Sequence, residues 1–279
     1  MTSDDTPTAT TGPAPAPPAR GGRGGSGHRL RVRRSERLTP HLVRVVFDGP
    51  GLDGIVDNGF TDRYLKLAFP RPGIDYPEPF DVAAIRASMP REAWPILRTY
   101  TVRSLDHDAG ELAIDFVVHG DLGVAGPWAL AAAPGDELTV LGPGGAYAPS
   151  PDADAHVLVG DEAALPAVAA ALERMPSGVP VDVYVQVDGP DDELDLTTAG
   201  AMTLRWLHRD AGDDLVEAVR ASEWPAGVVH AFVHGESGEV KALRAHLLEE
   251  RGLDRDRLSI SGYWRRGADE DTFQAEKRA

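Results

Sequence analysis

Short segments in which apolar and polar residues alternate fill the first half of the chain. A period of two is typical of strands that bury one face, and turn residues separate the segments. Six strands are predicted, at residues 30–33, 41–47, 64–69, 98–104, 111–119 and 137–141. Short strands with turns between them favour a small antiparallel barrel, accompanied by brief helices at 82–89 and 126–133.

The segment at 111–119 shows the alternation most clearly, because its two faces differ in polarity. It places Leu112, Ile114, Phe116 and Val118 on one face, and Ala113, Asp115, Val117 and His119 on the other. The polar face is open to two interpretations. It either lines a ligand site or simply contacts solvent.

Beyond residue 155 the pattern changes to apolar strands that alternate with helical periods. Strands are predicted at 156–160, 181–187, 203–207, 228–233 and 258–263, and helices at 161–175, 213–221 and 240–250. Such alternation is typical of βαβ units, which build a mostly parallel, doubly wound sheet. The predicted fold class is therefore an N-terminal six-stranded antiparallel barrel followed by an α/β domain.

Four regions follow from these patterns. Residues 1–27 contain no large apolar side chain, so a disordered tail is expected there. The barrel domain is predicted at 28–148 and the α/β domain at 149–267. Residues 268–279 are polar and are expected to form a flexible C-terminal tail.

Composition narrows the function classes. The formal net charge is −16, which disfavours nucleic acid and anionic membrane surfaces as partners. The chain has no cysteine, so thiolate metal sites, iron–sulfur clusters and cysteine nucleophiles are excluded. It also shows neither a span of membrane length nor a secretory signal, which makes the cytoplasm the default expectation. The oligomeric state is left open, with a monomer as the default.

Motifs of hydrolysis and phosphoryl transfer are missing from the sequence. We find no nucleophile elbow, no P-loop and no metal-ligand cluster, and the nine histidines lack the spacing of a zinc protease. Chemistry that a bound cofactor performs therefore remains.

Three segments are expected to face a cleft between the two domains. Residues 98–103 combine arginine, tyrosine and threonine, which suit a pyrophosphate, a flat ring and a ring nitrogen. Residues 115–128 bring glycines and a helix start, and residues 159–166 follow a parallel strand without a G-x-G-x-x-G motif. Each segment also has a plain structural interpretation: solvated strand charges, an exposed histidine, or acids that complement a helix dipole.

Ordered together, these motifs resemble a known family. The sequence reads R-T-Y-T-V-R, D-F-V-V-H-G, W-A-L-A-A-A-P-G-D, G-P-G-G, G-D-E-A-A-L-P and G-Y-W-R-R-G in succession. A P-R-P-G-x-D-Y-P loop lies at 70–77. From about residue 28 to residue 267 the chain is similar to siderophore-interacting proteins, which are FAD-containing ferric-siderophore reductases related to ferredoxin reductases.

The resemblance implies roles for particular residues. It makes Tyr100 and Thr101 the catalytic candidates beside the flavin, and makes Arg98 a phosphate ligand. The implied FAD and nucleotide contacts are Arg98, Tyr100, Thr101, Arg103, Asp115, Val117, His119, Ala125, Gly126, Trp128, Asp161, Glu162, Ala163, Ala164, Tyr263 and Trp264. Two positions depart from the family pattern. Ala163 stands where threonine is usual, and the segment before Trp128 lacks a hydroxyl for the phosphate.

The sequence therefore predicts an NAD(P)H-dependent, FAD-containing reductase that releases Fe(II) from a ferric siderophore. An anionic siderophore requires basic residues at the cleft, and charge and position favour Lys241, Arg244, Arg265 and Arg266, with no resident metal. Two alternatives remain open: a flavin reductase or electron-transfer component with another acceptor, and a non-catalytic siderophore- or flavin-binding module. The choice between NADPH and NADH is also open.

Overall fold

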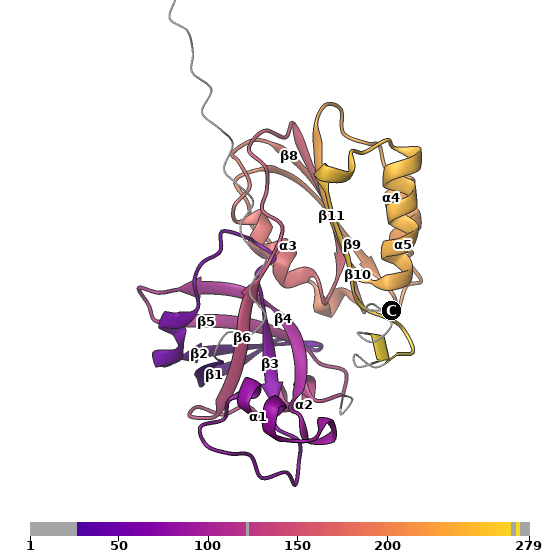
Figure 1. The fold of residues 1–279 in the computed structure, drawn as a ribbon. Helices are drawn as coiled ribbons and strands as arrows, with labels where there is room; N and C mark the ends of the chain where they lie inside the picture. Colours follow the sequence, from indigo (N-terminus) through magenta and orange to yellow (C-terminus); the bar gives the residue numbers. More distant parts are fainter. Residues whose placement is uncertain (1–26, 121–122, 269–271, 274–279) are drawn as a thin grey trace, which may run out of the picture.

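A computed structural model describes residues 27–120, 123–268 and 272–273 of the chain. All but one residue of the tail expected at 1–27, and most of the tail expected at 268–279, lie outside the described residues. The first half of the chain forms a barrel, and the second half forms an open sheet with helices (Figure 1). The predicted fold class is confirmed.

Six antiparallel strands close the barrel in the order β1-β2-β5-β4-β3-β6. Their bounds are β1 (His28–Thr39), β2 (Leu42–Asp48), β3 (Tyr64–Phe69), β4 (Ile96–Asp106), β5 (Glu111–Val117) and β6 (Glu137–Gly144). Closure pairs every strand on both sides, so the barrel leaves no free edge. The first strand is longer than the four residues predicted at 30–33, because residues 33–37 are polar and exposed and show no apolar alternation.

The barrel core contains the apolar face predicted for β5. Leu112, Ile114 and Phe116 are fully buried there. Helix α1 (Val82–Ser88) lies in the long excursion after β3, where the Asp81 carboxylate accepts hydrogen bonds from the N–H groups of Ala83 and Ala84. Helix α2 (Ala125–Ala131) packs on β2 and β5 and completes the core.

Five parallel strands form the second sheet in the order β11-β10-β7-β8-β9. They are β7 (Ala155–Asp161), β8 (Pro180–Val187), β9 (Ala201–His208), β10 (Val229–Glu236) and β11 (Leu258–Trp264). Helix α3 (Leu165–Leu172) packs on one face, while α4 (Leu215–Arg220) and α5 (Ser237–Ala245) pack on the other (Figure 1). Short turns of helix complete the chain at Pro50–Gly54, Arg91–Ala93, Pro190–Asp192, His246–Glu250 and Arg255–Arg257.

Helix α3 begins later than the sequence pattern suggests. The predicted helix at 161–175 starts only at Leu165, because the Asp161 carboxylate holds the N–H groups of Ala163 and Ala164 in a turn. Helix α5 begins earlier than predicted, since the Glu236 carboxylate accepts hydrogen bonds from Gly238 and Glu239 and caps it. Among the residues that the structure describes, no helix is long and apolar enough to cross a bilayer.

The barrel and the sheet share a packed seam. Leu42 of the barrel is buried in the same cluster as Leu165 and Leu172 of α3. Polar contacts flank this cluster. The Arg103 guanidinium pairs with Glu173, and the His41 imidazole lies 2.8 Å from the Asp192 carboxylate, which also accepts the His41 N–H.

The His41–Asp192 contact predicts a pH-dependent stability. Its hydrogen bond raises the pKa of His41, so its contribution is complete below the ordinary value of 6.5 and is lost as the pH rises through the raised pKa. His41→Ala should lower the free energy of unfolding by about 0.5–1 kcal/mol at pH 6, as expected for a part-exposed pair, and by less at pH 9.

Urea unfolding at both pH values measures this difference. His107→Ala, at an exposed turn position, serves as the control and should change neither value. An equal loss at pH 6 and pH 9 for His41→Ala would show that the imidazolium contributes nothing to the seam.

Candidate functional site

A cleft of about 1270 Å³ lies between the barrel and the carboxyl ends of the parallel strands. Pockets for single small molecules measure roughly 300–1,000 Å³, so this cleft has room for a dinucleotide and part of a second ligand. Its barrel wall comes from β3, β4, β5 and the segment leading into α2. Its other wall comes from the loops after β7, β8 and β9, together with the end of β11.

Strand β4 supplies consecutive residues to the cleft. Strict alternation would place Arg98 and Tyr100 on the side opposite to Thr99 and Thr101, yet all four line the cleft. The Tyr100 ring packs on Phe116 of the barrel core with 4.6 Å between ring centres, so its orientation is fixed by packing. The wall thus combines a guanidinium, two hydroxyls and a supported aromatic ring.

Thr101 is buried and shares a hydrogen bond with the Tyr263 hydroxyl, which comes from the opposite wall. Burial is the first cause that raises the pKa of Tyr263 above its ordinary value, so this phenol stays protonated. The pair connects β4 to β11 across the cleft. Both residues were expected near a flavin ring, and the structure brings them into contact.

Strand β5 supplies Asp115 and Val117 to the same wall, and His119 follows two residues after its end. Asp115 is buried, and both of its oxygens accept from the Arg44 guanidinium of β2, at 2.6 and 2.8 Å. The pairing raises the pKa of Arg44 and compensates the charge of Asp115. Asp115 therefore presents a fixed, hydrogen-bonded carboxylate, while His119 is exposed.

The start of α2 offers backbone N–H groups to the cleft. Ala125 and Gly126 both line it, and no side chain caps this helix. Gly123, at φ +78°, turns the chain into the helix without placing a side chain in the wall. Trp128, expected over the pyrophosphate, does not line the cleft; its half-buried ring packs against the barrel core, stacked 6.2 Å from Phe47, because a large apolar ring gains from burial.

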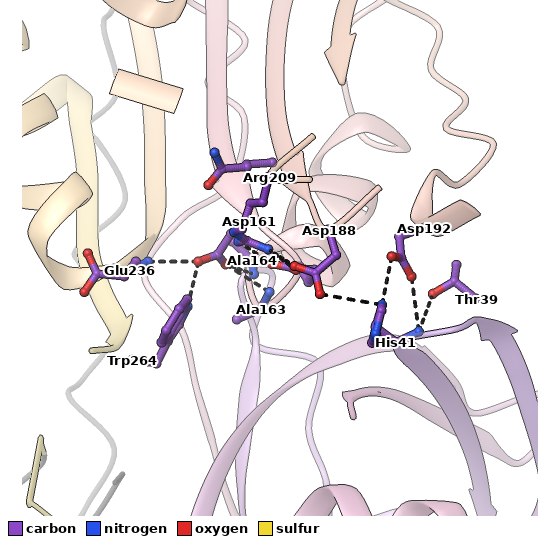
Figure 2. A network of polar contacts seen from close by, with 12 residues as sticks. Thr39, His41, Asp161, Ala163, Ala164, Asp188, Asp192, Arg209, Glu236 and Trp264 are labelled. Atoms are coloured by element: carbon purple, nitrogen blue, oxygen red, sulfur yellow. Dashed lines mark hydrogen bonds and ion pairs between the residues drawn. The ribbon is translucent and has the colours of Figure 1, made fainter. Parts of the chain in front are cut away.

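Asp161, at the end of β7, ties together three strand ends. Figure 2 shows its carboxylate accepting hydrogen bonds from the Trp264 indole at 2.6 Å and from the Glu236 N–H at 2.9 Å. Its second oxygen accepts from Ala163 and Ala164 at 2.9 and 3.3 Å. Asp161 is fully buried and does not reach the cleft.

Electrostatics at this strand end are strongly perturbed. Burial, followed by the charge of Glu162, raises the pKa of Asp161 to about 7, and the Trp264 hydrogen bond opposes the shift. Burial and the charge of Glu236 also raise the pKa of Glu239 on the cleft wall. Glu239 is thus a perturbed acid on the cleft wall, as is typical of functional sites, whereas Asp161 is buried outside the cleft.

Glu162 begins a chain of charges along the far wall. Its carboxylate forms a paired contact with the Arg209 guanidinium, with 2.7 Å between Nη2 and Oε2. Arg209 also reaches Asp188 at 2.9 Å, and Asp188 lies 3.8 Å from His41 of the barrel (Figure 2). Burial alone would lower the pKa of Arg209, but Glu162 and Asp188 raise it above its ordinary value.

Most, but not all, of the residues proposed from the sequence meet at the cleft. Those that line it are Arg98, Tyr100, Thr101, Asp115, Val117, His119, Ala125, Gly126, Glu162, Ala163, Tyr263, Trp264 and Arg266. Those that do not line it are Arg103, Trp128, Asp161, Ala164, Lys241, Arg244 and Arg265. Arg103 pairs with Glu173, Ala164 is buried under α3, and Lys241 and Arg244 project from the exposed face of α5.

Sequence reasoning missed several residues of the cleft. Lys66 lies on β3, while Asp188 and Arg209 follow the ends of β8 and β9. The signal that could have found the last two is their position, because the carboxyl ends of parallel strands meet at one edge of the sheet. Among the described residues, no group of His, Asp and Glu has the arrangement of a metal site.

The cleft fits a flavin dinucleotide in its donor set. A guanidinium and uncapped N–H groups suit phosphates, a fixed aromatic ring suits a flat ring system, and hydroxyls suit ring nitrogens. Arg98, the start of α2, Tyr100 and Thr101 provide these groups on one wall. The second wall is free to hold another ligand.

Residues 31–147 match the siderophore-interacting FAD-binding domain, and residues 153–267 match the siderophore-interacting protein domain. The chain belongs to the siderophore-interacting protein family. The resemblance in the sequence motifs is thereby confirmed.

Relatives of known name share most of this length. The ferric vibriobactin reductase ViuB of Vibrio cholerae is 34% identical, over 88% of this chain and 91% of its own. The NADPH-dependent ferric-chelate reductase of Escherichia coli is 34% identical, over 84% and 91%. The crystal structure of the siderophore-interacting protein SipS from Aeromonas hydrophila superposes with a TM-score of 0.77 at 31% identity, covering 91% of this chain and 97% of its own.

Asp161 generates a test of this siderophore-interacting protein's architecture. In Asp161→Asn the amide NH₂ faces N–H donors, which leaves buried donors unpaired at about 1–3 kcal/mol each, so the free energy of unfolding should fall by about 2–3 kcal/mol. Because the pKa of Asp161 is raised, the folded wild type binds more protons than the unfolded chain between pH 4 and 7, so this group's contribution to stability falls as the pH rises through that range. The loss in the variant should therefore be larger at pH 5 than at pH 8.

Urea unfolding at these two pH values measures the effect, with Asp108→Asn in an exposed turn as the matched control. A loss no greater than that of the control would mean that the Asp161 carboxylate does not hold the strand ends together.

Proposed function

We propose that this protein is an NAD(P)H-dependent, FAD-containing reductase of ferric siderophores, acting in the cytoplasm. The observation that carries the proposal is one continuous cleft whose barrel wall suits a flavin and whose other wall follows the carboxyl ends of parallel strands. The names of the relatives, a ferric vibriobactin reductase and a ferric-chelate reductase, support the same chemistry.

On the barrel wall, each side chain has a distinct task in this proposal. Arg98 and the N–H groups of Ala125 and Gly126 bind phosphates, and Tyr100 supports the flat ring from the core side. The Thr101 hydroxyl, held by Tyr263, orients the reactive edge of the ring. A bound flavin supplies the conversion between two-electron donation and one-electron reduction of Fe(III).

On the acceptor side, two cations are suited to an anionic chelate. Lys66 lines the cleft on β3, and Arg266 lines it beyond β11, where its guanidinium is largely exposed. Local positive charge is needed to bring an anionic ferric siderophore to a protein whose net charge is −16. Fe(II) binds siderophores more weakly than Fe(III), so reduction releases the iron.

A redox cycle in one cuvette tests the proposal. The FAD-reconstituted protein should show a flavin spectrum that bleaches under anaerobic NADH or NADPH and recovers when a ferric siderophore is added. Bleaching without recovery would leave a flavin reductase with another acceptor. Failure to retain flavin would favour the non-catalytic binding module.

The acceptor cations predict a second result. Lys66→Gln and Arg266→Gln should each raise the KM for an anionic ferric siderophore about three- to tenfold, the effect of one charge contact of about 1 kcal/mol, with little change in the rate of flavin reduction. Arg244→Gln removes the same charge from a position off the cleft and is the matched control. Equal KM values in all three variants would remove these cations from the acceptor site.

A further inference from the structure

The order of the strands in the sheet indicates where the electron donor binds. The chain runs from β7 to β8 and β9 on one side and then crosses to β10 on the other, so the order in which strands are added reverses between β7 and β10 while all strands stay parallel. Nucleotides bind in such folds at the carboxyl edge beside this reversal, and an acid after a neighbouring strand binds the adenosine ribose. Asp188 occupies that position, directly after β8 and on the cleft wall.

Arg209, the nearest cation to Asp188, is already engaged. Its guanidinium contacts the Glu162 and Asp188 carboxylates together, and only about a quarter of its side chain is exposed. The three charges sum to −1. A 2′-phosphate that approached this guanidinium would have to displace a carboxylate or lie beside two of them.

Further acids surround this part of the cleft. Asp213, Asp214 and Glu239 line the same wall, and Arg266 lies 3.6 Å from Glu239. The wall therefore holds more carboxylates than cations.

These observations favour a donor with a free ribose hydroxyl. A carboxylate accepts a hydrogen bond from a 2′-hydroxyl, whereas a 2′-phosphate adds about 1.5–2 negative charges at neutral pH. Because like charges in a partly buried site repel strongly, the same Asp188 that binds the hydroxyl rejects the phosphate.

We propose that Asp188, with Arg209 held between it and Glu162, selects NADH over NADPH as the electron donor. The assignment rests on the proposed function, since it concerns the donor side of the same cleft. It differs from the donor given in the name of the Escherichia coli relative. Asp188 is a specificity-determining residue that contacts the ribose, and Arg209 is a positioning residue that orients the Asp188 carboxylate.

Binding of the oxidised nucleotides tests the assignment without relying on turnover. Isothermal titration of the FAD-loaded protein should give a Kd for NAD⁺ at least about tenfold lower than that for NADP⁺, the effect of one unfavourable charge contact. Asp188→Asn removes the negative charge that faces the phosphate and one of the two carboxylates that hold Arg209, so the ratio of the two Kd values should shift toward NADP⁺ by about tenfold. The ratio of kcat/KM for flavin reduction by NADH and NADPH should shift in the same direction.

Asp191→Asn is the matched control, because it removes the same charge from an exposed position off the cleft. An equal shift in Asp191→Asn would attribute the preference to the net charge and overturn the role of Asp188. Tighter binding of NADP⁺ by the wild type would overturn this assignment and leave the proposed reductase intact. Binding of neither nucleotide would overturn both.

Discussion

The α/β wall of the cleft depends on the carboxylate of Asp161. This carboxylate receives N–H groups from the turn after β7, from the end of β10 and from the Trp264 indole of β11. Without those hydrogen bonds, three strand ends and the start of α3 would have no common anchor. A buried carboxylate is costly in itself, and only its set of donors makes it compatible with the interior.

The turn after β7 differs from a glycine-rich nucleotide-binding loop, because a carboxylate anchors it. Gly160 leaves no room for a side chain, because a Cβ there would lie 2.6 Å from the Ala164 Cβ, so the turn after β7 is tight. The acids that follow are not free ligands: Asp161 is buried and Glu162 is paired with Arg209. The cleft thus has an acidic, pre-organised donor side opposite a barrel wall that carries Arg98 and backbone N–H groups.

Local patterns predicted the elements well, since periods of two and of 3.6 report directly on buried faces. The apolar face of β5 and the parallel order after residue 155 followed from them. Roles that depend on which strands become neighbours were less accessible. The sequence alone does not tell whether Trp128 packs on the barrel core or lines the cleft, because its neighbours Phe47 and Phe116 come from other strands. Arg209 lies at the cleft because β9 pairs with β8, which places the ends of these two strands side by side.

The geometry of the cleft is finally set by contacts between residues distant in the sequence. Leu42 of the barrel packs under α3, while Arg103 pairs with Glu173 and His41 with Asp192. Apolar packing continues across the seam, so the two domains share one buried cluster beside the cleft. The Thr101–Tyr263 hydrogen bond lies at the centre of that arrangement, so the barrel residue expected beside a flavin is oriented by the opposite domain.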